Sequence, residues 1–82
     1  MMEIKILGMG CVNCEKLERM VFNALAELNI DACVQKVQDI PEIMKYGVMS
    51  TPGLVINEKV VLSGRVPSKA ELEKILLEHV NR

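Results

Sequence analysis

The residues best suited to chemistry are two cysteines at the spacing Cys-x-x-Cys, in Cys11-Val12-Asn13-Cys14. A dithiol at this spacing can close a small disulfide ring with little rearrangement, and two thiolates can also bind a soft metal ion. The chain has three cysteines, the third being Cys33. An odd number is not typical of a disulfide scaffold, so in a reducing compartment the spacing indicates redox chemistry or metal binding. The motif alone leaves both possibilities open.

The position of the pair in the chain is more informative than its spacing. Ile4–Leu7 is a short β-branched run that predicts a strand, and Gly8-Met9-Gly10 predicts a turn. From Cys14 to Asn29, apolar residues recur at three- and four-residue steps and predict a helix, with Asn29 as its C-cap. Cys11 then lies where free N–H groups and the helix dipole favour a thiolate, and its pKa should fall below the free value of about 8.5. Cys14, in the first turn, should be more buried and able to resolve a mixed disulfide.

The rest of the chain predicts a strand, a short helix, a hairpin and a final helix. These elements are expected at 32–37, at 39–46 with an Asp39/Glu42 capping box, at 54–56 with 60–62, and at 68–80 with a Ser68/Glu71 capping box. The order is β-α-β-α-β-β-α, and its first helix is long enough for a right-handed parallel crossover. We therefore expect an α/β fold, a mixed four-stranded sheet flanked by helices on both faces. The chain is expected to form a single domain, 1–82.

Composition excludes several classes of protein. Ten Lys and Arg against eleven Asp and Glu give a formal charge of −1, which argues against nucleic-acid binding. No apolar run approaches the roughly 20 residues that span a bilayer, and residues 1–5 lack the features of a signal peptide, so we expect no membrane contact and a cytoplasmic location. Because only Phe22 and Tyr46 are aromatic, the core should be aliphatic and methionine-rich.

Other reactive side chains have structural interpretations. Cys33 lies within the alternating pattern of the strand expected at 32–37. Because free cysteine is often buried, a structural role is expected. Met20 and Met44 fit apolar stripes, and His79 should lie at the boundary of the last helix. Lys16 is near enough in sequence to influence the reactivity of the Cys11 thiol.

A second motif, Ser50-Thr51-Pro52-Gly53, directly precedes the hairpin. With Gly10-Cys11-Val12-Asn13-Cys14, with Ser63-Gly64-Arg65 and with the order of elements, it makes the whole chain resemble a small thioredoxin-like or glutaredoxin-like protein. Such minimal redox-active disulfide proteins are found in archaea and bacteria. The resemblance implies a thioredoxin-like fold and a thiol–disulfide oxidoreductase, with Cys11 as nucleophile and Cys14 as resolving thiol. It also implies a cis Pro52 packed against the cysteines, a Thr51 backbone that holds a substrate strand, and a Gly64 that closes the last strand.

The resemblance implies partners as well. These are disulfide-containing protein substrates and a flavin-dependent electron donor of the thioredoxin-reductase type. The protein itself is expected to be a monomer without a cofactor or a metal. The chain departs from the family at Val12-Asn13, where thioredoxins usually carry Gly-Pro and glutaredoxins Pro-Tyr. Lys5 stands where thioredoxins carry the buried acid that assists the resolving cysteine.

An alternative is a soft-metal chaperone. Gly8-Met9-Gly10-Cys11-Val12-Asn13-Cys14 also resembles the Gly-Met-x-Cys-x-x-Cys loop of heavy-metal-associated domains, which carry copper or zinc. That fold continues β-β-α-β and ends in a strand, whereas this chain predicts a helix, a hairpin and a terminal helix. A closed zinc site would need four ligands, and only Cys33 and the distant His79 remain.

Overall fold

The computed structural model describes residues 2–80. Its elements are β1 (Met2–Leu7), α1 (Val12–Leu28), β2 (Ala32–Val37), α2 (Ile40–Lys45), β3 (Gly53–Ile56), β4 (Lys59–Ser63) and α3 (Lys69–Val80). The strands form one sheet in the order β2-β1-β3-β4. β1 and β2 are parallel and the other pairs antiparallel. The mixed four-stranded sheet predicted from the sequence is confirmed.

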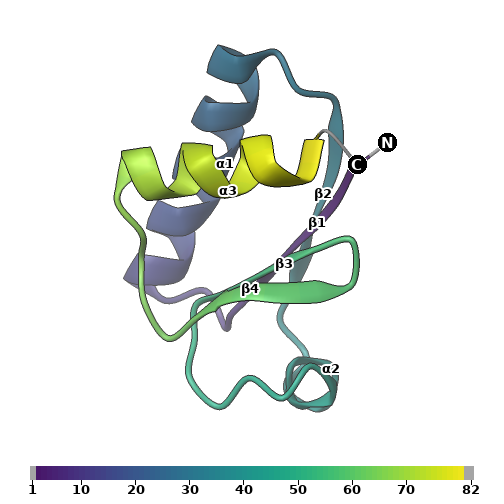
Figure 1. Ribbon diagram of the computed structural model, residues 1–82. Helices are drawn as coiled ribbons and strands as arrows, with labels where there is room; N and C mark the ends of the chain where they lie inside the picture. Colours follow the sequence, from purple (N-terminus) through teal and green to yellow (C-terminus); the bar gives the residue numbers. More distant parts are fainter. Residues whose placement is uncertain (1, 81–82) are drawn as a thin grey trace.

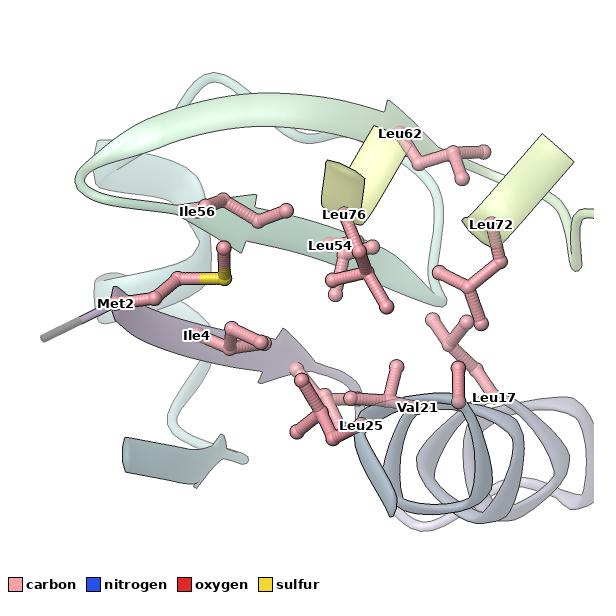
Figure 2. Packing of buried hydrophobic residues seen from close by; sticks show 12 residues of the cluster. Met2, Ile4, Leu17, Val21, Leu25, Leu54, Ile56, Leu62, Leu72 and Leu76 are labelled. Carbon is pink, nitrogen blue, oxygen red and sulfur yellow. The ribbon is translucent and has the colours of Figure 1, made fainter. Parts of the chain in front are cut away.

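Each face of the sheet carries its own hydrophobic cluster. α1 and α3 pack on one face and α2 on the other (Figure 1). The larger cluster, shown in Figure 2, joins strands to α1 and α3 through Met2, Ile4, Ile6, Leu17, Val21, Ala24, Leu25, Leu54, Ile56, Leu62, Leu72 and Leu76. The smaller cluster contains Leu7, Ile43, Val48 and Val55. Because side chains alternate along a strand, Ile6 and Leu7 are buried on opposite faces, so the end of β1 is fixed from both sides.

The ends of the elements follow local chemistry. Asn29 ends α1 in the left-handed region, with φ 55°, as expected of a C-cap. Asn57 and Glu58, with φ of 50° and 67°, form the two-residue turn between β3 and β4. Ser68 Oγ accepts a hydrogen bond of 3.2 Å from the backbone N–H of Glu71, which confirms that cap.

Several ends of elements differ from the predictions. β1 begins at Met2 rather than Ile4, because it pairs along its whole length with β2. α1 begins at Val12 rather than Cys14, since Cys11 takes the N-cap position. Asp39 occupies the N-cap of α2, but its side chain makes no capping hydrogen bond. The prediction of a capping box at this helix is therefore wrong.

The expectation of a methionine-rich core is also wrong. Met2 is buried, but Met9, Met44 and Met49 are 59%, 62% and 90% exposed. α2 is only six residues long and buries only Ile43, which leaves Met44 facing solvent. The core is therefore aliphatic, and the methionines gather largely on the surface.

Cys33 is exposed, which contradicts the expectation of a buried structural thiol. It lies on the edge strand β2 opposite Glu3, on the same face as Leu7 and Val37. The short α2 covers that face only at the Leu7 end, so the Cys33 end remains open to solvent.

The C-terminal helix agrees with its sequence pattern. Leu72 and Leu76 of α3 are buried. His79 is half-buried at the boundary, and its Nδ1 lies 2.8 Å from the carbonyl oxygen of Ile75. Within residues 2–80, no helix has the length and apolar character needed to cross a membrane.

Candidate active site

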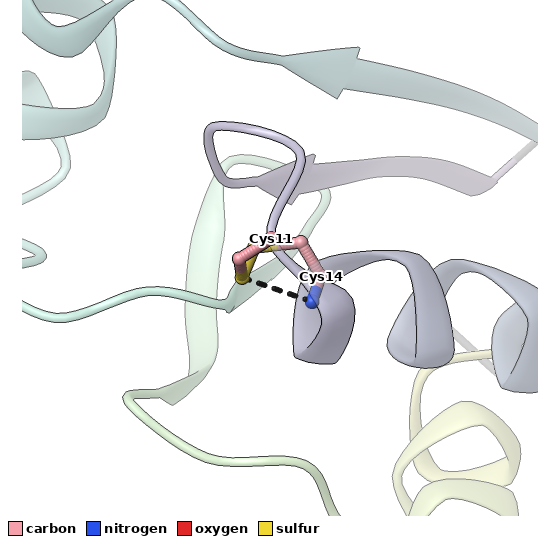
Figure 3. Close-up of a disulfide and its surroundings, with 2 residues drawn as sticks. All are labelled: Cys11 and Cys14. Atoms are coloured by element: carbon pink, nitrogen blue, oxygen red, sulfur yellow. Dashed lines mark hydrogen bonds between the residues drawn. A yellow bond between two sulfur atoms is a disulfide. The ribbon is translucent and has the colours of Figure 1, made fainter.

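The two cysteines lie at the N-terminus of α1, where they form a disulfide (Figure 3). Their Cα atoms are 5.0 Å apart. The backbone N–H of Cys14 donates a hydrogen bond of 3.2 Å to Cys11 Sγ, so the sulfur of Cys11 caps the helix. Cys11 is exposed, whereas Cys14 is only 5% exposed. The pair therefore presents one sulfur to solvent and keeps the other inside, as predicted.

Two glycines bring the chain from β1 to this helix. Gly10 has φ 83°, a conformation that other residues rarely adopt. Gly8 is buried, and its N–H donates to the carbonyl of Val37 at 2.9 Å. A Cβ built on Gly8 would overlap Cys14 Sγ, so the backbone lies directly against the buried sulfur. From the sequence, Gly8 is assigned only to the turn and to the loop of the metal-chaperone alternative; its position three residues before Cys11 is the one signal for this contact.

The loop before β3 approaches the same place. The Thr51–Pro52 peptide bond is cis, the geometry that the resemblance implies. Pro52 is fully buried and Thr51 is exposed. The Cβ of Thr51 lies 3.9 Å from the position that a Cβ on Gly8 would take. Thr51 and Cys14 are thus neighbours of the same glycine.

Gly64 contacts this loop at Ser50 and Pro52. Its N–H donates to the carbonyl of Pro52 at 2.8 Å. It has φ 78°, and a Cβ there would lie 3.1 Å from the Cβ of Ser50. Gly64 therefore supports the Pro52 loop through its backbone.

An apolar groove of about 250 Å³ lies beside Thr51, and no pattern in the sequence predicts it. It is lined by Met9, Ile40, Ile43, Met44, Val48, Met49 and Thr51. Three of the exposed methionines therefore line one surface, which continues from the Pro52 loop and from the residue two before Cys11. We call it the methionine groove.

Lys5 takes part in a separate polar cluster. Its Nζ donates to Tyr46 Oη at 2.8 Å and to Glu58 Oε1 at 2.7 Å. These hydrogen bonds raise the pKa of Lys5 above its ordinary value. The Lys5 and Tyr46 hydrogen bonds lower the pKa of Glu58. Lys5 thus links β1 to the C-cap residue of α2, Tyr46, and to the hairpin turn. Lys16 is exposed, and within residues 2–80 no hydrogen bond or ion pair joins it to Cys11.

Residues 2–77 match a protein-family model described as "Thioredoxin domain". The chain is 42% identical over 76 residues to a thioredoxin of Methanothermobacter thermautotrophicus, covering 93% of this chain and 99% of that one. It is 36% identical over 80 residues to a thioredoxin of Methanocaldococcus jannaschii, covering 98% of this chain and 92% of that one.

Solved structures show the same fold. The germline-specific thioredoxin Deadhead of Drosophila melanogaster superposes with a TM-score of 0.69 at 19% identity, covering 96% of this chain and 81% of that one. The oxidised thioredoxin of Plasmodium falciparum gives 0.65 at 15% identity, with the same two coverages. The fold is thioredoxin-like, as the sequence predicted.

The metal-chaperone alternative is not supported. The chain continues after β2 with α2, a hairpin and a terminal helix, rather than with the β-β-α-β order of heavy-metal-associated domains. Within residues 2–80, no group of three or more His, Cys, Asp or Glu side chains is placed to hold a metal. The matches to thioredoxins agree with the redox interpretation of Cys11 and Cys14.

Proposed function

Since the chain belongs to the thioredoxin family and is a thiol–disulfide oxidoreductase, we propose that Cys11 is its attacking thiolate and Cys14 its resolving thiol. The contrast in burial supports these roles. Cys11 is exposed at the N-terminus of α1, where the helix dipole and the Cys14 N–H stabilise a negative sulfur. Cys14 is only 5% exposed, so a substrate disulfide meets the exposed Cys11 first.

The reaction then has two displacements. The Cys11 thiolate attacks one sulfur of a substrate disulfide, forming a mixed disulfide and releasing the other substrate sulfur as a thiolate. The Cys14 thiol loses its proton and attacks Cys11 Sγ. The Cys11–Cys14 bond forms, the bond from Cys11 to substrate breaks, and the second substrate sulfur leaves as a thiolate. The substrate gains two electrons and the protein loses two.

We propose that the substrate lies across Thr51 and the methionine groove. The exposed Thr51 leaves its backbone available for pairing with an extended segment, while Pro52 and Gly64 hold the loop in place. Methionine side chains are flexible and polarisable, so they adapt to apolar residues of different shapes. This arrangement suits protein substrates whose disulfide is flanked by apolar residues.

We propose further that the oxidised form is reduced again by a flavin-dependent reductase, the partner that the family resemblance implies. Reductase partners and disulfide substrates in general are properties of the family. We propose that the protein acts in the cytoplasm, as a monomer with a single domain.

Turnover of single-cysteine variants tests the roles. With dithiothreitol as electron donor and insulin as substrate, Cys11→Ser should abolish reduction, and Cys14→Ser should accumulate mixed disulfides. Cys33→Ser is the matched control and should retain turnover, because Cys33 lies on the exposed β2 edge outside the site. Mixed disulfides through Cys14 in the Cys11→Ser protein would reverse the assignment.

A further inference from the structure

The resolving step requires Cys14 to lose a proton, and its sulfur is almost out of contact with solvent. Burial in apolar surroundings disfavours a thiolate, so a nearby proton acceptor is needed for a fast reaction near neutral pH. Lys5, the residue at the position of the family's buried acid, is held by Tyr46 and Glu58 and is a cation. A proton acceptor must therefore come from elsewhere in the fold.

A small cavity beside Cys14 supplies the candidates. Its volume is about 20 Å³, enough for one water molecule, and its lining includes Gly8, Cys14, Glu15, Glu18, Lys36 and Gln38. Glu18 lies four residues after Cys14 on α1, so the two side chains project from the same helix face. Glu18 is 24% exposed at its side chain, and its Oε1 lies 3.7 Å from Lys36 Nζ on β2. Glu15, one residue from Cys14, projects in a different direction and is exposed.

We propose that Glu18 accepts the Cys14 proton in the resolving step, directly or through one water in this cavity, and that Lys36 holds the Glu18 carboxylate in position from β2. The charged groups around it are then Lys36 from β2, Glu15 from its own helix and the developing Cys14 thiolate. The proton moves from Cys14 Sγ to the Glu18 carboxylate as the new bond to Cys11 Sγ forms. This inference rests on the proposed roles of Cys11 and Cys14.

The decisive measurement separates the two displacements. In a reduced Cys33→Ser background, each molecule should release two equivalents of thionitrobenzoate from 5,5′-dithiobis(2-nitrobenzoate). The first equivalent reports attack by Cys11, and the second reports resolution by Cys14. Rapid mixing across a range of pH gives both rates.

Glu18→Gln should slow the second phase by about 10- to 100-fold near pH 7, within or just below the usual range for a positioned proton acceptor. The difference in second-phase rate between Glu18→Gln and the parent protein should shrink above about pH 9.5, because a thiol then ionises without assistance. The first phase should be unchanged. Glu27→Gln is the matched control, because it also removes an α1 carboxylate paired with a lysine, Lys69, but lies outside the cavity.

Lys36→Gln should slow the second phase by less than Glu18→Gln does, and in the Glu18→Gln background it should add little, since both act through one carboxylate. A second phase unaffected by Glu18→Gln, or slowed equally at every pH, would overturn the inference while leaving the cysteine roles intact. In the same Cys33→Ser background, a Cys11→Ser protein whose remaining thiol, Cys14, released its one equivalent as fast as the wild-type first phase would instead overturn the proposed function itself.

Discussion

Gly8 lies directly against the sulfur of Cys14, so closely that a Cβ on Gly8 would overlap Cys14 Sγ. The same position would bring that Cβ to 3.9 Å from the Cβ of Thr51. The residue that follows β1 therefore lies between two motifs, those of Cys14 and Thr51, that are far apart in the sequence. A residue with no reactive atom thus limits the space available to the buried thiol.

Gly8→Ala should destabilise the oxidised protein by about 1–3 kcal/mol, because the added methyl group overpacks a filled site. Urea unfolding of the oxidised protein measures this. In a Cys14→Ala background the same substitution should cost much less, since the clashing sulfur is gone. An equal loss in both backgrounds would show that the cost arises from the backbone and not from contact with Cys14.

Cys11 should be alkylated faster than Cys14 or Cys33 in the reduced protein. The α1 N-terminus favours the Cys11 thiolate, whereas Cys14 is buried. Cys33, which is exposed but lies on β2 away from any helix N-terminus, should be labelled second. A short iodoacetamide pulse followed by peptide mass spectrometry gives the order. Faster labelling of Cys14 would contradict the assignment of nucleophile and resolving thiol.

Substitutions in the methionine groove should separate protein substrates from small ones. Met49→Lys places a charge on a side chain that is 90% exposed in the groove, so the fold should tolerate it. We expect kcat/KM for insulin to fall by roughly 5- to 30-fold, the equivalent of 1–2 kcal/mol of docking energy. Reduction of 5,5′-dithiobis(2-nitrobenzoate) should be unchanged. Phe22→Lys, at a 50% exposed site on α1, is the control; an equal loss there would argue against a specific groove.

The Lys5–Glu58 pair should make stability depend on acidity. Lys5 and Tyr46 lower the pKa of Glu58 below its ordinary value of 4.5. A lowered carboxyl pKa contributes stability above the unfolded value, and this contribution is lost as the pH falls through the folded value. Glu58→Gln should therefore reduce stability at neutral pH, and the difference from wild type should diminish below 4.5.

Thermal unfolding of both proteins across this pH range tests the expectation. Glu73→Gln on α3 is the control, because within residues 2–80 no ion pair involves Glu73. A loss of stability in Glu58→Gln that stays the same in acid would indicate that the turn conformation, and not the charge, is responsible.

Local patterns were sufficient to predict the elements and the chemistry. The apolar stripe of α1, the β-branched runs of the strands and the spacing of Cys11 and Cys14 each depend on residues close in sequence. The predicted order of elements and the close approach of the two cysteines agree with the structure. The parallel pairing of β1 with β2 also followed from chain order, because the helix between them is the crossover that parallel neighbours require.

Tertiary structure alone decided how these elements face one another. The exposure of Cys33 depends on how far the short α2 reaches across a sheet face, which no periodicity within β2 records. The same short helix leaves Met44 exposed in a groove that also needs Met9 and Met49 from other segments. The contact of Gly8 with Cys14, and the cavity that joins Cys14 to Glu18 and Lys36, arise only when β1, α1 and β2 close around one point. Sequence patterns report which side of an element is apolar, whereas distances between elements are set by packing.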